Sequence, residues 1–152
     1  MPEWVQWLQA LSVPTIAAVG ALLAWQQVKI ARTKLRHDLF DRRFAVFEAA
    51  RKFLVTVMRN GKISVPDLQS YAVGVIDAQF LLNREVHDYL VEIRKRAATM
   101  QGLKDTLEPL PAGDEKARLA GKAGEEIAWL VAQLDVLPEK FKPFLTLGLR
   151  PN

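Results

Sequence analysis

Apolar residues recur every three or four positions along most of the chain, a spacing typical of helices with one hydrophobic face. The first clear run covers residues 28–59 and ends at Asn60-Gly61, a pair typical of a helix C-terminus. Its apolar positions, from Leu35 to Val57, form one continuous arc when they are projected onto a helix at about 100° per residue. We expect this arc to pack into a core.

Two further helices follow the same pattern. Ser64, with Pro66 and Asp67 behind it, marks the start of a helix that runs to Leu82, because serine caps helices and proline suits their first turn. Asn83 is a suitable cap for the next helix. The apolar face of that helix consists of Val86, Tyr89, Leu90, Ile93, Ala97 and Met100.

The loop PLPAGD, residues 109–114, precedes a fourth helix that runs from Asp114 to Leu134. A short terminal piece, PEKFKPFL, follows it. No segment alternates apolar and polar residues as a half-buried strand does. The chain is therefore predicted to be all-α: an antiparallel bundle of about four helices that follows a single N-terminal helix.

The N-terminal stretch is different, because no charged side chain occurs from Trp4 to Val28. Its first 22 residues, WVQWLQALSVPTIAAVGALLAW, would form a helix of about 33 Å, close to the roughly 30 Å hydrocarbon core of a bilayer. Trp4 and Trp7 stand near one end and Trp25 near the other, where aromatic rings favour the headgroup region. We therefore predict a single transmembrane helix.

Basic residues follow this stretch directly. They are Lys29, Arg32, Lys34 and Arg36, and the first acid after them is Asp38. By the positive-inside rule the C-terminal part faces the cytoplasm and the N-terminus lies outside, and the four cations suit anionic lipid headgroups. The predicted organisation is a membrane anchor at residues 1–28 and a cytosolic helical bundle at residues 29–152, in the cytoplasmic (inner) membrane of a bacterium.

Two alternatives to a plain span stay open. Gln6 and Gln9 lie opposite the tryptophans on a helix and Pro14 interrupts its hydrogen bonds, so residues 3–12 could lie in the membrane interface before a short span from Val13. The stretch could also be a buried helix of a soluble bundle. A cleaved signal peptide is disfavoured, because its basic residues would precede the apolar run.

Lipid is the first partner that the sequence predicts, and a second copy or another protein is the next. Ala17 and Ala21 have the spacing of small residues that lets two membrane helices approach closely, which favours self-association.

Residues 29–62 contain ten Lys and Arg against three Asp and Glu. These cations do not share one face with aromatic side chains and no nucleic-acid-binding motif is present, so nucleic acid is disfavoured as a partner.

Signals for catalysis are weak. The chain has no cysteine, which excludes thiolate metal sites and cysteine nucleophiles, and it has no Walker loop, G-x-G-x-x-G, G-x-S-x-G or H-E-x-x-H motif. A di-iron bundle requires Glu-x-x-His pairs, but the residues three before His37 and His87 are Lys34 and Arg84. We therefore predict no catalytic residue, no metal ligand and no cofactor, and do not expect an enzyme.

Two adjacent arginines interrupt the apolar run of residues 38–54. Arg42 falls at the edge of the apolar arc and is expected at the surface, whereas Arg43 falls inside the arc. A buried guanidinium needs a partner, because its charge cannot be neutralised by loss of a proton. We therefore predict that Arg43 forms a structural ion pair with Glu85 or Glu92, on a neighbouring helix.

The run KLRHDLFDRRFAVFEAARKFL at 34–54 and the FKPFL at 141–145 resemble a family of small uncharacterised bacterial membrane-anchored helical proteins. These share a short apolar N-terminus, a K-L-x-x-D-L-F-D-R-R-F-like helix and a closing F-x-P-aromatic-L. The resemblance implies an anchor and a bundle and transfers no catalytic residue. We expect a membrane-anchored interaction or assembly protein. The alternative is a membrane-active effector, of a phage-defence or toxin-like system, that acts through its anchor.

Overall fold

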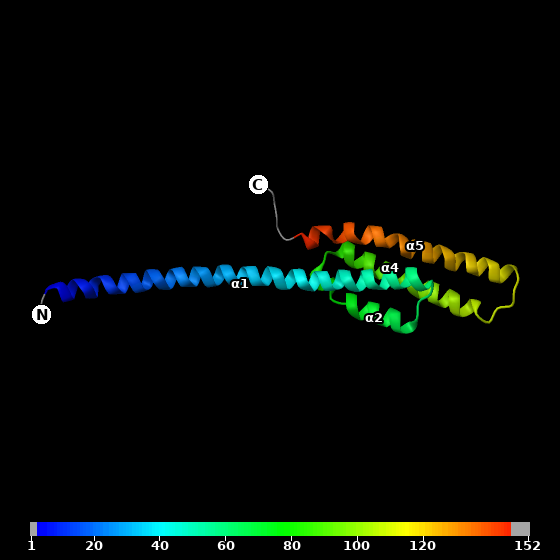
Figure 1. The fold of residues 1–152 in the computed structure, drawn as a ribbon, viewed down its shortest axis with the longest axis horizontal. Helices are drawn as coiled ribbons and strands as arrows, with labels where there is room; N and C mark the ends of the chain where they lie inside the picture. Colours follow the sequence, from blue (N-terminus) through cyan, green and yellow to red (C-terminus); the bar gives the residue numbers. More distant parts are fainter. Residues whose placement is uncertain (1–2, 147–152) are drawn as a thin grey trace. The chain divides into compact units, whose positions relative to one another are not determined.

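The structure is a computed structural model that describes the backbone of residues 3–146 and the side chains of residues 20–146. Every regular element in the described part is a helix (Figure 1). The helices are α1 (Glu3–Asn60), α2 (Val65–Val75), α3 (Ala78–Leu81), α4 (Arg84–Leu107) and α5 (Asp114–Leu145). The predicted all-α class is confirmed for these residues, with four main helices and the single turn of α3.

The chain divides into two compact units, residues 1–39 and residues 40–152. Helix α1 contributes to both, so the N-terminal stretch and the first helix of the bundle belong to one helix. Within the part of the chain whose side chains the structure describes, no helix is both long enough and apolar enough to cross a membrane. Most of the predicted anchor, residues 1–28, lies outside that part, so the anchor stays a prediction.

The second unit is an antiparallel bundle, in which each main helix reverses the direction of the one before it (Figure 1). Aromatic pairs join α1 to two of its neighbours. The ring of Phe47 lies 5.5 Å from that of Phe141 on α5, and the ring of Phe53 lies 4.6 Å from that of Tyr71 on α2. These contacts place α1 between α2 and α5.

The core draws apolar side chains from every helix of the bundle. Its buried members are Val46, Ala50, Phe53, Leu54, Val57, Ile63, Tyr71, Ala78, Val86, Leu90, Ile93, Ala97, Met100, Leu130, Leu137 and Phe141. The predicted arc of α1 is thus confirmed from Val46 to Val57, and the predicted face of α4 is confirmed except that Tyr89 is only half-buried. Leu35, by contrast, was expected in the arc and is exposed.

Capping residues explain where the helices of the bundle begin and end. Gly61 has a positive φ of 60°, which stops α1. Ser64 and Asp67 form a reciprocal capping box at the start of α2: the Asp67 N–H donates to Ser64 Oγ over 3.3 Å, and the Ser64 N–H donates to Asp67 Oδ2 over 3.0 Å. The hydrogen bonds from Ser64 lower the pKa of the Asp67 carboxyl. Asn83 Oδ1 accepts from the Val86 N–H over 3.0 Å and caps α4.

Two elements differ from their predicted lengths. The helix expected over 64–82 is divided into α2 and α3, because the Ile76 N–H donates to Val73 O and the helical ladder is interrupted there. Helix α5 continues to Leu145 through Pro138 and Pro143, although each proline removes a ladder hydrogen bond.

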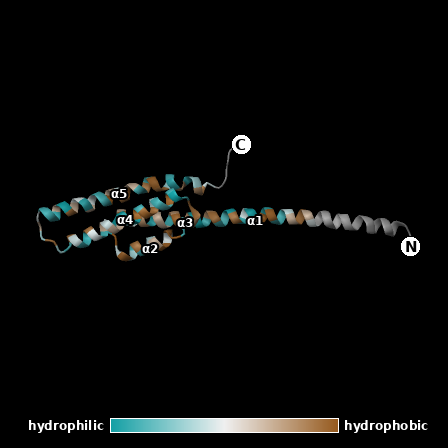
Figure 2. Ribbon diagram, turned by 180° about the vertical axis from the view of Figure 1, so that it is seen from behind, coloured by the Kyte–Doolittle hydropathy of each residue, from teal (hydrophilic) through white to brown (hydrophobic). Residues whose placement is uncertain are grey.

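Burial explains why α5 does not end at Leu134. Leu137 and Phe141 are almost completely buried, whereas Pro138 and Pro143 are both exposed. The apolar contacts of the last turns therefore offset the lost hydrogen bonds, and the proline rings project away from the core. Figure 2 shows the change along α5, from mostly hydrophilic residues in its N-terminal half to hydrophobic ones further on.

Two tyrosine hydroxyls lie inside the bundle. The Tyr71 hydroxyl donates to Leu90 O over 2.9 Å and so links α2 to α4. The Tyr89 hydroxyl is buried and has no hydrogen-bond partner among the described residues. Burial raises the pKa of both phenols, that of Tyr89 to about 12. Both therefore stay neutral at physiological pH.

Candidate protein-interaction surface

The predicted membrane-interface residues are exposed wherever the structure describes them. Trp4, Trp7 and Ala17 lie outside the described side chains. Trp25, Lys29, Arg32, Lys34 and Arg36 are all exposed, as is Ala21. The ammonium of Lys29 lies 5.7 Å from the centre of the Trp25 ring, within the range of a cation–π interaction. An aromatic ring and a cation therefore occur together at the predicted end of the anchor.

Residues 20–39 form a helix that exposes large apolar side chains all round. These are Leu22, Leu23, Trp25, Val28, Ile30 and Leu35. A helix that is apolar on several sides is normally covered by protein or by lipid. The pattern fits the predicted anchor and equally fits a helix that another protein covers.

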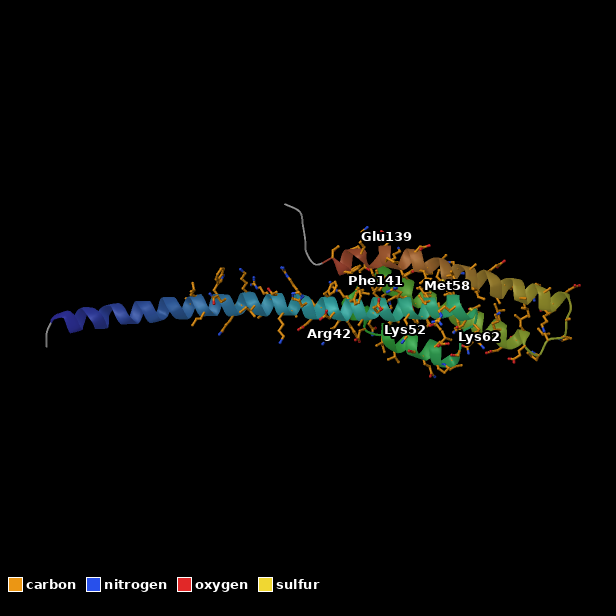
Figure 3. The ribbon with its side chains drawn as sticks, in the orientation of Figure 1. Arg42, Lys52, Met58, Lys62, Glu139 and Phe141 are labelled. Carbon is orange, nitrogen blue, oxygen red and sulfur yellow. The ribbon has the colours of Figure 1, made fainter. Side chains whose placement is uncertain are left out.

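The ion pair predicted for Arg43 is wrong. Arg43 is half-buried, its Nε–H donates to Leu81 O over 3.0 Å, and its guanidinium lies 5.7 Å from the ring of Phe144. A neutral partner suffices because the side chain still reaches water, and Leu81 O belongs to the last turn of α3, where carbonyls lack helical partners. Arg43 thus joins α1 to α3 and α5. Arg42 is exposed, as predicted (Figure 3).

The two carboxylates expected to pair with Arg43 have other partners. Glu85 accepts a hydrogen bond from Lys140 Nζ over 2.6 Å, which links α4 to α5. Glu92 accepts from Arg96 Nε over 3.0 Å, and this bond raises the pKa of Arg96. Arg96 also contacts α5, since its guanidinium lies 4.4 Å from the ring of Trp129. These charged groups stabilise the α4–α5 pair.

The described residues contain no group of three or more acidic or histidine side chains placed to hold a metal ion. The strongest candidate for function is instead an apolar surface on α2 and α3. Val73, Ile76 and Phe80 are large apolar side chains with exposed fractions of 72%, 61% and 80%. We call these three residues the apolar ridge.

The residues of the ridge lie close together in the chain. Ile76 and Asp77 keep right-handed helical backbone angles between α2 and α3. Val73 and Ile76 line the same groove, and Phe80 follows four residues later in α3. The ridge therefore spans the junction of α2 and α3.

A groove of about 290 Å³ lies beside the ridge, between α2 and α4. Two ridge residues line it, so the ridge and the groove share a wall. The side chains that line the groove from the two sides include Val73, Ile76, Gln79, His87, Val91 and Arg94. We call this hollow the α2–α4 groove.

Two exposed charged side chains have no ion-pair partner in the described part of the chain. They are Asp77, which directly follows Ile76 in the chain, and Arg94, which lines the groove. Asp88, which follows the groove-lining His87 in α4, already has two partners. It lies 3.5 Å from Arg84 Nε and 3.3 Å from His87 Nδ1. The surface thus combines apolar side chains with one unpaired acid and one unpaired base.

The apolar ridge was missed in the sequence, although a signal for it was present. The segment 65–82 carries apolar residues on more than one side of a helix, since Leu68, Tyr71 and Ala78 face the bundle while Val73 and Phe80 do not. A short helix with more apolar positions than one core face can bury has some left for another contact.

The exposed apolar side chains of this surface can bind an apolar partner, and its charged side chains can orient that partner. This is the composition of a protein-interaction surface.

Comparisons with protein families, with curated proteins and with solved structures find no match to this chain. The resemblance carried by residues 34–54 and 141–145 therefore stays an expectation.

Proposed function

We propose that the chain is a membrane-anchored helical bundle that acts as an interaction and assembly module. The observation that carries the proposal is the apolar ridge. Its three large side chains stay exposed although the same bundle buries the apolar faces of α1 and α4. Exposed apolar area of this kind is stabilised when a partner covers it, by about 25 cal/mol for each Å² removed from water.

Attachment to the membrane is the second part of the proposal. It is supported by the uncharged stretch from Trp4 to Val28 and by the exposed apolar and basic side chains that follow it in α1. We place residues 1–28 in the bacterial cytoplasmic membrane with the N-terminus outside. The basic side chains from Lys29 to Arg36 then lie among anionic headgroups, where each contributes about 1 kcal/mol.

Fractionation tests the attachment. We expect the full-length chain to stay in the membrane pellet through an alkaline carbonate wash. Such a wash disrupts electrostatic contacts with the membrane surface, but it does not extract a helix that spans the hydrocarbon core. A variant that lacks residues 1–33 should move to the supernatant, and a reporter fused after Asn152 should give a cytoplasmic signal.

Full-length chain found in the supernatant without detergent would contradict the anchor, and a periplasmic reporter signal would reverse the orientation. Growth arrest on expression that requires residues 4–28, but is unchanged by Phe80→Ser, would favour the membrane-active effector over the interaction module.

A further inference from the structure

We propose that the apolar ridge and the α2–α4 groove form one self-complementary surface, on which a second copy of this chain docks about a two-fold axis. The proposal rests on the proposed function, because it names the partner of the same surface. In a two-fold contact the same patch of both copies meets itself. A patch that holds a projection and a hollow side by side can therefore make two equal contacts at once.

The shapes of the two features agree with such a contact. Phe80 is the most exposed large apolar side chain among the described residues, and it projects at the end of the ridge. The groove beside it has room for an aromatic ring, at about 290 Å³, and its walls include the apolar side chains of Val73, Ile76, Leu90 and Val91. Phe80 of one copy in the groove of the other would cover the ring and fill the hollow.

The charges of Asp77 and Arg94 also favour a second copy of this chain as the partner. Asp77 lies between Ile76 and Phe80 in the chain, whereas Arg94 lines the groove. When Phe80 of one copy enters the groove of the other, its Asp77 approaches Arg94 of the partner subunit, and the two-fold axis repeats this pair. Both side chains lack an ion-pair partner in the described residues, so both gain one.

The carboxylate also argues against lipid as the occupant. An apolar ridge that inserts into an anionic membrane is normally flanked by cations alone, because an acid at the surface is repelled by the headgroups. Here Asp77 is exposed and directly follows Ile76 in the chain. A protein surface that supplies a cation beside an apolar hollow fits better, and this chain carries that surface.

Charge reversal in the full-length chain, purified in mild detergent, tests the proposal. We expect the unaltered chain to dimerise, as measured by analytical ultracentrifugation. Asp77→Arg alone and Arg94→Asp alone should each weaken the dimer at least about tenfold, because each places like charges together at both contacts. Arg84→Asp, a reversal at an exposed arginine of α4 outside the groove, serves as the matched control and should leave the dimer unchanged.

The decisive sample is a mixture of the two single variants. One copy then supplies only basic side chains at these positions and the other only acidic ones, so both contacts become attractive. We expect the Asp77→Arg and Arg94→Asp chains to form a mixed dimer with each other although each dimerises poorly alone. A loss of folding in either variant would not produce this rescue, and circular dichroism checks the fold of both.

Three results would overturn the proposal: a full-length chain that is monomeric at every concentration, single variants that dimerise as well as the unaltered chain, or variants that do not rescue each other. Loss of binding to anionic vesicles by Phe80→Ser, with the dimer intact, would assign the ridge to lipid instead. A monomer whose residue 80 crosslinks to a different protein would overturn the self-contact while leaving the proposed function in place.

Discussion

Phe141→Ala is expected to lower the free energy of unfolding by about 4 kcal/mol, the usual loss when a fully buried phenylalanine is removed and leaves a cavity. Phe141 has no exposed surface, and its ring packs 5.5 Å from that of Phe47 (labelled Phe141 in Figure 3). It lies beyond Pro138, in the part of α5 that the sequence pattern assigned to a short terminal piece. Urea unfolding of the full-length chain, followed by circular dichroism, measures the loss.

Phe44→Ala is the matched control, because Phe44 belongs to the same row of aromatic rings and is 41% exposed. Its removal leaves no closed cavity, so we expect a loss of about 1 kcal/mol. Equal small losses for both substitutions would mean that the last turns of α5 do not pack as the structure has them.

Gly74→Ala is expected to destabilise the bundle by about 1–3 kcal/mol, as overpacking of a tight contact does. A Cβ atom on Gly74 would lie 2.6 Å from the Cβ atom of Ala49, a distance that side chains do not tolerate. Ala49 has no rotatable side chain, so α1 and α2 must move apart. In an unobstructed helix, replacing glycine by alanine stabilises the fold by about 1 kcal/mol. The sign of the change in unfolding free energy therefore shows whether α1 and α2 are in close contact at Gly74.

Two companion variants complete this test by urea unfolding. Gly102→Ala adds a methyl group to a helix position with open space around it and should stabilise the chain. Ala49→Gly removes the obstructing atom, so its combination with Gly74→Ala should recover most of the loss. If Gly74→Ala and Gly102→Ala both stabilise the chain, α2 does not pack against α1 at this point.

Helix class and core faces could be predicted from the sequence because they depend on local spacing. The apolar arc of α1 from Val46 to Val57 packs into the core as expected, and α4 begins at its predicted cap, Asn83. Leu35 continues the same spacing, yet it is exposed. Spacing identifies the apolar side of a helix but does not show where along the helix a neighbour covers that side.

The partners of charged side chains and the position where α5 ends both depend on contacts between residues that are far apart in the sequence. The spacing of apolar residues does not predict such contacts. Arg43 was expected to need a carboxylate, but a half-exposed guanidinium is satisfied by Leu81 O. The sequence pattern predicted a helix that ends at Leu134, whereas α5 continues to Leu145 because Leu137 and Phe141 are buried. The ridge was missed because its apolar residues share the segment 65–82 with those of the core.

Site-specific photocrosslinking from position 80, in cells that express the full-length chain, tests the central claim most directly. A photoreactive amino acid that replaces Phe80 should crosslink in membranes to one defined protein, which mass spectrometry identifies as a second copy or a different chain. The same probe in place of Glu139, an exposed residue of α5 (Figure 3), serves as the control and should not give that product. A probe at position 80 that captures no protein, or captures the same mixture as the probe at position 139, would contradict the assignment of the apolar ridge as an interaction surface.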